Sequence, residues 1–198
     1  MYTSEKTLKQ QKEKIRERIK KSFNALSVQY CSTLSQKIQQ RFLETNLFLS
    51  SESLLIYVAF DKEVATEWII NESLMMKKKV FVPRSLGDGQ LAICQIKDFK
   101  KDLILGRYSI LEPRLEIKPI QDCNDITLFV LPGLAFTRKG ERLGRGAGYF
   151  DRLFQNEVQG EKMALAYEFQ IVPSLPIEKH DQKVDSVLTE ANLYRGGK

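Results

Sequence analysis

The sequence is poor in cysteine, histidine and long apolar runs, and each shortage removes a class of protein. Cys31, Cys94 and Cys123 stand far apart without a CxxC pair, so neither a disulfide framework nor a zinc site is expected. His180 is the only histidine, which excludes a site built on paired histidines. No run of 18 apolar residues occurs, so we expect neither a membrane-spanning helix nor a membrane partner.

The first 21 residues also lack the apolar stretch of a signal peptide, and they contain three Glu, which a transit peptide would avoid. We therefore expect a cytoplasmic protein. The same segment carries eight Lys or Arg, a balance of +5 within a chain whose net charge is +6. Such a basic segment suits either nucleic acid or anionic small molecules such as nucleotides.

Length and patterning favour one folded unit. The 198 residues are 42% hydrophobic and 28% charged, which is typical of a single globular domain over residues 1–198. Apolar periodicity predicts helices over 4–27, 29–47, 64–76 and 147–158, and strands over 53–60, 79–83, 90–96, 125–131, 162–167 and 184–188. This alternation predicts a three-layer α/β/α domain with a largely parallel central sheet and an N-terminal helical pair. Ligands in such sheets bind beyond the carboxyl ends of the strands.

One of those ends leads into RLGRGAGYFD, residues 142–151, which has three glycines in five positions. Glycine admits positive φ and lets backbone N–H groups approach a ligand closely. Arg142 and Arg145 add forked donors suited to phosphate, and a helix beginning near Ala147 would add a partial positive charge. The loop lacks the Lys-Ser/Thr of a P-loop and the spacing of GxGxxG, so a flexible turn with solvated arginines is the alternative.

The first predicted helix supplies a second indication. Its apolar side chains fall within an arc of about 80° and form a stripe that faces the core: Leu8, Ile15, Ile19, Phe23 and Leu26. Lys12 lies inside this stripe and Arg16 lies at its edge. Two interpretations are open, since Lys12 can extend its ammonium to water or the two cations can bind a phosphate.

Together these segments resemble the 5-formyltetrahydrofolate cyclo-ligase family, also called methenyltetrahydrofolate synthetase. LPGLAFTRKGERLGRGAGYFDRL is similar to the family signature PGxxFxxxGxRLGxGxGYYD, and Lys12-x-x-Ile15-Arg16 is similar to the N-terminal KxxLR. YVAFDKEVATEWI resembles the segment that carries the substrate glutamate, at Glu63 here. Val82-Pro83-Arg84, Glu112-Pro113 and the C-terminal HDQKVDSVLTE extend the resemblance over nearly the whole chain.

The resemblance implies an ATP- and Mg²⁺-dependent conversion of 5-formyltetrahydrofolate to 5,10-methenyltetrahydrofolate, with release of ADP and phosphate. The formyl oxygen would attack the γ-phosphate, and N10 would then close on the activated carbon. The implied partners are these two small molecules, with no nucleic acid. A monomer is expected.

The resemblance also assigns roles to residues. ATP would be bound by Lys12, Glu13, Lys14, Ile15, Arg16, Arg142, Leu143, Gly144, Arg145, Gly146, Ala147, Gly148, Tyr149 and Phe150. The folate would contact Val58, Glu63, Arg145, Gly146, Ala147, Gly148 and Tyr149. Arg145 and Tyr149 are the implied catalytic residues, and Asp151 and Asp181 would hold Mg²⁺.

Three residues depart from the family pattern. Ala147 stands where many members carry Lys, Phe150 replaces a second Tyr, and Thr137 stands where Asp is frequent. We expect these changes to alter affinity more than they abolish activity. Two other functions remain as alternatives: an RNA-binding protein that uses the basic N-terminal helix, although no aromatic RNA-stacking motif is present, and an ATP-independent sugar-phosphate isomerase.

Overall fold

A computed structural model describes residues 2–106, 109–155 and 158–196, with side chains from residue 7 onward. Its frame is a seven-stranded sheet in the order β11-β10-β9-β6-β1-β2-β3. The strands are β1 (Ser53–Ile56), β2 (Lys79–Gly87), β3 (Gln90–Ile96), β6 (Leu128–Leu131), β9 (Glu161–Leu165), β10 (Ser186–Leu188) and β11 (Leu193–Arg195). The five central strands are parallel, and only β3 and β11 at the edges are antiparallel, which confirms the predicted α/β class.

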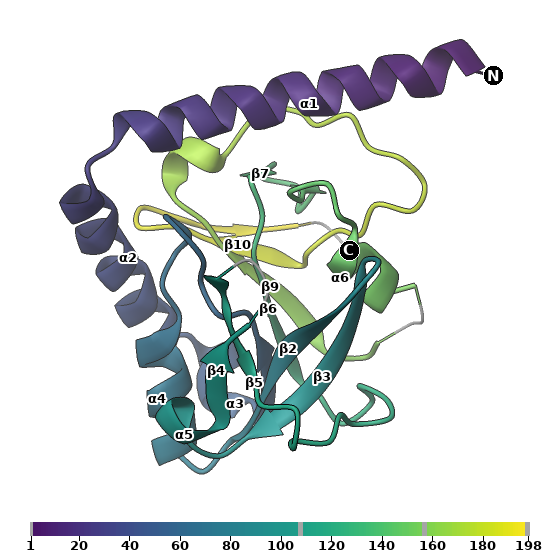
Figure 1. Ribbon diagram of the computed structural model, residues 1–198. Coiled ribbons are helices and arrows are strands. Elements are labelled where there is room, and N and C mark those ends of the chain that lie inside the picture. Colours follow the sequence, from purple (N-terminus) through teal and green to yellow (C-terminus); the bar gives the residue numbers. More distant parts are fainter. Residues whose placement is uncertain (1, 107–108, 156–157, 197–198) are drawn as a thin grey trace.

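The N-terminal helical pair is also confirmed, as α1 (Tyr2–Ala25) and α2 (Val28–Leu43). Ser27 separates the two helices, because its Oγ accepts a hydrogen bond from the Tyr30 backbone N at 3.1 Å and so caps α2. Three shorter helices follow: α3 (Asn46–Ser50), α4 (Glu67–Met75) and α5 (Phe99–Asp102). In Figure 1, α1 lies along one end of the molecule, above β7, and α2 descends from it beside the sheet. No helix of the described residues is long and apolar enough to cross a membrane.

The sheet buries apolar side chains on both faces. Leu54, Ile56 and Val80 point to the face covered by α1, α2 and α4, where Ile19 and Phe42 complete the core. Their neighbours along the strands point to the other face, as the period of two requires. This second layer is thinner than expected, because α6 and irregular chain cover Leu55, Phe81 and Phe129 there.

The order of the strands reverses at β1, and this reversal positions the site. The chain passes from β1 through α4 to β2 on one side, and it later returns to β6 on the other side of β1. The loops that follow β1 and β6 therefore begin side by side at the carboxyl edge of the sheet, where ligands bind in open α/β sheets. The second loop includes a small hairpin of β7 (Ala135–Phe136) and β8 (Arg142–Leu143).

Several boundaries differ from the prediction. The helix after the glycine loop, α6 (Tyr149–Leu153), begins two residues later than Ala147 and is much shorter than 147–158. Gly148 has a φ of +68°, outside the helical region, so the helix can start only after it. The first strand ends at Ile56 instead of residue 60, because the Thr66 hydroxyl donates to the Tyr57 carbonyl at 2.7 Å and folds residues 57–66 into a loop. The strands β4 (Leu103–Leu105), β5 (Leu111–Pro113), β7, β8 and β11, the helix α5 and the 3₁₀ turn η2 (Glu168–Gln170) were not predicted.

Candidate active site

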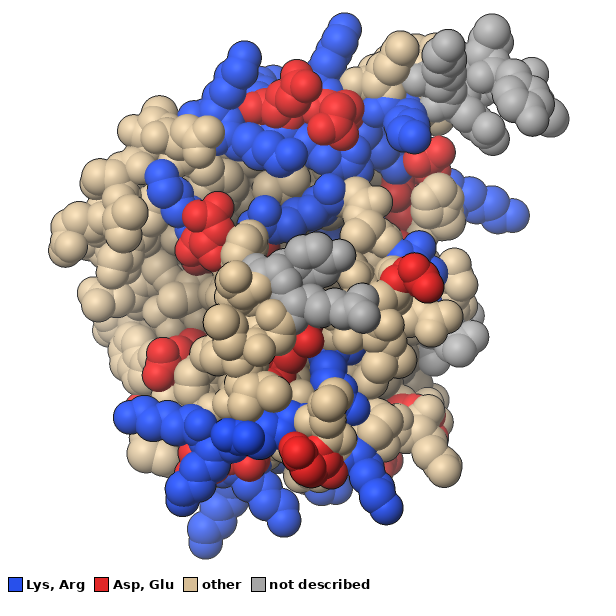
Figure 2. Space-filling model, in the orientation of Figure 1, with Lys and Arg blue, Asp and Glu red and all other residues tan. Residues whose placement is uncertain are grey.

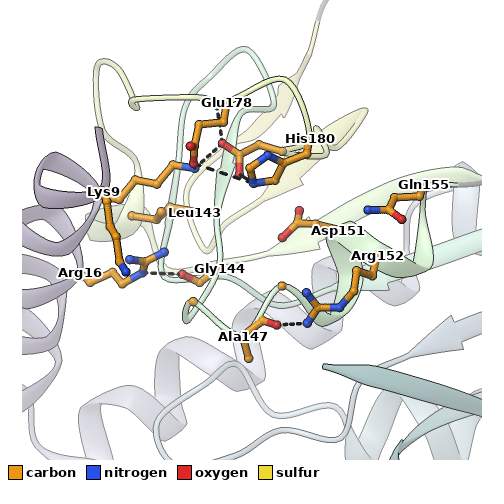
Figure 3. Close-up of a pocket in the computed structure, with 14 residues that line it drawn as sticks. Lys9, Arg16, Leu143, Gly144, Ala147, Asp151, Arg152, Gln155, Glu178 and His180 are labelled. Atoms are coloured by element: carbon orange, nitrogen blue, oxygen red, sulfur yellow. Dashed lines mark hydrogen bonds and ion pairs between the residues drawn. The ribbon is translucent and has the colours of Figure 1, made fainter. Parts of the chain in front are cut away.

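A cleft of about 640 Å³ lies between α1, the glycine loop and the segment before β10. Figure 3 shows its walls: Lys9 and Arg16 project from α1, Glu178 and His180 lie opposite them, and Asp151 and Arg152 project from α6. Lys12, Leu143, Gly144, Gly146, Ala147, Gly148, Gln155 and Asp181 complete the lining. The helical stripe and the glycine loop, which are far apart in the sequence, thus meet at one cavity.

Lys12 is buried at the wall of this cleft, with 6% of its surface exposed. Its Nζ lies 2.6 Å from Glu178 Oε2 and 2.6 Å from Asp181 Oδ2. Burial alone would lower the pKa of Lys12, but the hydrogen bonds and charges of Asp181 and Glu178 raise that pKa above its ordinary value. The ammonium is therefore held charged inside the protein, and it does not extend to bulk water.

Arg16 connects α1 to the glycine loop. Its Nε donates to the Gly144 carbonyl at 3.0 Å, and its Nη1 pairs with Glu13 Oε2 at 3.0 Å. Glu13 itself stays exposed, Lys14 also stays exposed, and Ile15 packs against the core. Of the five consecutive residues assigned to ATP, only Lys12 and Arg16 line the cleft.

The glycine loop uses the backbone freedom of its glycines. Gly146 and Gly148 have φ of +111° and +68°, a region that side chains with a Cβ rarely adopt. Beneath the loop, Arg142 is buried and its Nη2 lies 2.6 Å from Asp151 Oδ1. Arg142 thus fixes the loop to α6 from below, and Leu143 is buried in the core beside it.

A second, smaller cavity of about 110 Å³ lies on the other side of the loop, with Glu63 and Pro132 in its wall. Arg145 spans the boundary between the two loops, because its Nε lies 2.9 Å from Glu63 Oε1 and its guanidinium lies 5.5 Å from the Phe60 ring centroid. The Phe60 backbone N donates to Glu63 Oε2 at 3.1 Å. Burial raises the pKa of Glu63 above its ordinary value, although Arg145 opposes that rise.

Aromatic residues close the small cavity. Tyr149 and Phe150 both line it, and the Tyr149 hydroxyl lies 3.1 Å from Ser85 Oγ at the end of β2. Phe150 packs against the core and against the guanidinium of Arg142 at 6.0 Å. Val58 is half-buried against the core and lines neither cavity.

The two carboxylates assigned to Mg²⁺ both line the large cleft, and each already has a cation as partner. Asp151 Oδ1 accepts from Arg142 and from the Gln182 backbone N, at 2.6 and 3.2 Å. Asp181 Oδ2 accepts from Lys12 and from the Glu178 backbone N at 2.7 Å. Among the described residues, the group with metal-ligand spacing is Glu178, His180 and Asp181, whose ligand atoms lie within 4.8 Å of one another.

Sequence reasoning missed Glu178, Arg152 and Ser85. Glu178 stands three residues before Asp181, and Arg152 stands one helical turn after Gly148, but neither spacing forms a recognised motif.

The structure explains why Thr137 can stand where the family often carries Asp. Its Oγ1 accepts from the Lys139 and Glu141 backbone N atoms at 3.3 and 3.2 Å, so a hydroxyl closes the β7–β8 turn as a carboxylate would.

Two adjoining cavities lie where the strand order reverses, which is the usual place for the active site of an α/β enzyme. The family model of the 5-formyltetrahydrofolate cyclo-ligase family matches residues 8–190. The chain therefore belongs to this family, and it is an enzyme of folate metabolism.

Individual relatives agree with this assignment. The chain is 30% identical to the 5-formyltetrahydrofolate cyclo-ligase of Mus musculus, over 93% of this chain and 96% of the relative. It is 24% identical to that of Escherichia coli K12, over 89% and 98%. A solved 5,10-methenyltetrahydrofolate synthetase from Aquifex aeolicus superposes with a TM-score of 0.82 at 29% identity, covering 94% of this chain and 93% of the other. The corresponding protein of Mycoplasma pneumoniae, at 24% identity and a TM-score of 0.70 over 90% and 98%, shows the same fold.

Proposed function

We propose that the chain converts 5-formyltetrahydrofolate to 5,10-methenyltetrahydrofolate with ATP and Mg²⁺, releasing ADP and phosphate, and that residues 1–198 act as one domain. The observation that carries the proposal is the shared wall of the two cavities. Gly144, Ala147, Gly148 and Asp151 line both of them. A phosphate group in the large cleft and the formyl-bearing end of a folate in the small cavity would therefore meet across a single stretch of backbone.

The large cleft suits the nucleotide. Lys12 and Arg16 present cations to it, and the positive-φ glycines leave room for phosphate oxygens beside the backbone. Phosphoryl transfer passes through a loose transition state, which needs positioned cations and N–H groups more than a protein nucleophile. No serine or cysteine is among the described residues that line the cleft, which is consistent with that requirement.

The small cavity suits the ring end of the folate, which carries the formyl group. Glu63 offers a buried carboxylate, which is a strong acceptor for ring N–H groups, and Arg145 keeps that carboxylate paired until a ligand arrives. Tyr149 and Phe150 offer aromatic faces beside it. Arg145 is exposed enough, at 43% of its side chain, to turn its free N–H groups toward the oxygen that receives the phosphate.

The residues assigned to Mg²⁺ fit a hard cation. Carboxylate oxygens of Asp151 and Asp181 face one cleft, and Mg²⁺ in such sites takes one or two carboxylates together with phosphate oxygens and water. The bound ion would neutralise charge on the phosphates. Because Lys12 now pairs with Asp181, we propose that the phosphates draw the ammonium away and leave the carboxylate available.

The reaction balances without a protein nucleophile. The formyl oxygen bonds to the γ-phosphorus as the bond to ADP breaks. N10 then bonds to the formyl carbon and loses its proton, and the carbon–oxygen bond breaks to release phosphate. The part of this chain is to hold both ligands in line and to exclude water from the activated carbon.

The direct test incubates the protein with 5-formyltetrahydrofolate, ATP and Mg²⁺ and follows the near-ultraviolet absorbance of the methenyl product. No signal from folded protein would refute the proposal. Isomerisation of a sugar phosphate in the absence of ATP would favour the alternative of an ATP-independent sugar-phosphate isomerase.

Figure 2 shows Lys and Arg side chains gathered along α1, the feature that motivates the RNA-binding alternative. Lys12 and Arg16, however, turn into the cleft and pair with carboxylates. Tight, strongly salt-dependent RNA binding in a filter assay would support that alternative. The monomeric state and the cytoplasmic location stay predictions.

A further inference from the structure

Arg152 is a cation of the large cleft that the family resemblance did not assign. It projects from α6, and its Nε donates to the Gly89 carbonyl at 2.8 Å, at the tip of the β2–β3 hairpin. Its Nη2 donates to the Ala147 carbonyl in the glycine loop. The guanidinium therefore ties the hairpin tip to the loop, and these two bonds fix its position.

Two glycines make room for this guanidinium. A Cβ at Gly89 would lie 1.5 Å from Arg152 Nη2, and a Cβ at Gly148 would lie 3.0 Å from Nη1. Both glycines have positive φ, +75° and +68°. The guanidinium thus rests against backbone on two sides, in a place that larger residues would fill.

The charge of Arg152 is not neutralised by a carboxylate in the described part of the chain. Lys12 and Arg16, which line the same cleft, each pair with acidic side chains, whereas the described residues place no Asp or Glu oxygen within 4 Å of the Arg152 guanidinium. A guanidinium carries five N–H donors, and backbone carbonyls use two of these. Lys9 also has no carboxylate partner among the described residues of the cleft. Unlike Arg152, however, its side chain is not held in place by any hydrogen bond between described residues.

The position of Arg152 faces that of Arg16. In Figure 3 the two guanidinium groups approach the cleft from opposite sides, with Ala147 between them at its floor. An anion above Ala147 would lie between two forks of N–H donors. Fixed guanidinium groups lose little conformational entropy on binding, which favours a charged ligand at this point.

We infer that Arg152 binds a phosphate group of the nucleotide opposite Arg16, an inference that rests on the proposed ATP site. The same contact holds the hairpin tip against the glycine loop. The hairpin carries Ser85, which contacts Tyr149, so the nucleotide steadies the wall of the folate cavity through Arg152.

The test measures binding by calorimetry in the absence of folate, with ATP·Mg²⁺ and with adenosine as probes. Arg152→Ala raises the Kd for ATP about tenfold or more, the effect of one charge-assisted hydrogen bond, while the Kd for adenosine stays unchanged. Arg18→Ala, which removes an exposed arginine of α1 outside the cleft, is the matched control for net charge.

Two more variants separate charge from structure. Arg152→Gln keeps amide donors for the backbone carbonyls but loses the cation, so it weakens ATP binding as Arg152→Ala does. Adding Ala147→Lys to Arg152→Ala returns a cation to the same wall and restores part of the affinity. Circular dichroism shows whether each variant is folded.

The outcomes separate this inference from the proposed function. Wild-type protein that does not bind ATP overturns both. Wild-type binding with an unchanged Kd in Arg152→Ala and Arg152→Gln overturns the role of Arg152 alone. An equal loss of ATP and adenosine affinity assigns Arg152 to holding the hairpin and also refutes phosphate binding.

Discussion

Replacement of Lys12 by methionine removes the ammonium from the cleft and keeps the length of the apolar stem. The change leaves Glu178 and Asp181 facing each other without the cation that lies 2.6 Å from each. Loss of one partner from a fully buried pair costs about 3–5 kcal/mol. Water reaches these carboxylates, whose side chains are 28% and 15% exposed, so we expect a smaller loss. The expected loss of unfolding free energy is about 2 kcal/mol.

Urea denaturation at pH 7 measures this loss. With a slope of about 2 kcal/mol per molar urea, the midpoint falls by about 1 M. Lys21→Met, which removes an exposed lysine from the same helix, is the control and leaves the midpoint nearly unchanged. The triple variant Lys12→Met/Glu178→Gln/Asp181→Asn removes the unpaired charges and recovers most of the stability, yet it binds ATP poorly because the cation is still missing.

The pH dependence of stability follows from the direction in which the pKa of Lys12 is shifted. The pKa of Lys12 is raised above 10.5, since its hydrogen bonds to Asp181 and Glu178 outweigh its burial. Its contribution to stability is therefore complete below pH 10.5 and is lost as the pH rises through the folded-state value. An unchanged midpoint at pH 7, or a triple variant that binds ATP normally, would refute the reasoning.

Three further predictions concern the smaller cavity. Arg145→Ala reduces turnover by about 100-fold or more because a positioned transition-state donor is lost. It changes the urea midpoint little because Arg145, in its pair with Glu63, is exposed to solvent. Normal kinetics in this variant would refute the proposed role of Arg145. Glu63→Gln abolishes folate binding. The stability of this variant relative to wild type improves as the pH rises above 4.5, because burial raises the pKa of Glu63 and disfavours the ionised form. Urea midpoints of both proteins at pH 4 and 7 measure this change, and a difference between the two midpoints that is the same at both pH values would contradict it. Phe150→Tyr changes turnover by less than about threefold, since the ring is only half-buried and a hydroxyl finds space at its edge. Steady-state kinetics measure this change, and a larger loss of turnover would show that the reaction requires an apolar ring edge at this position.

Most of the sheet could be predicted from the sequence, because buried parallel strands have continuous apolar runs. Leu54, Phe129 and Ala164 lie in such runs and are fully buried. The shortest elements could not be predicted. β7 and β8 have two residues each, and their pairing depends on the Thr137 turn and on contact with α1, not on local periodicity.

The site was predictable in part. Helical periodicity placed Lys12 on the inner face of α1, but its partners Glu178 and Asp181 lie 166 and 169 residues away, a distance that no local pattern spans. The glycines of the loop indicated positive φ, and Gly146 and Gly148 adopt it. The same freedom at Gly148 moved the start of the following helix from residue 147 to Tyr149, since a left-handed residue cannot be part of a right-handed helix.

The measurement that tests the central claim most directly counts methenyl product and phosphate in the same reaction. Wild-type protein with 5-formyltetrahydrofolate, ATP and Mg²⁺ is predicted to release one phosphate for each methenyl group, and neither product forms when ATP is omitted. Methenyl product without phosphate, or phosphate released at the same rate without the folate, would contradict a reaction in which the two cavities act through one glycine loop.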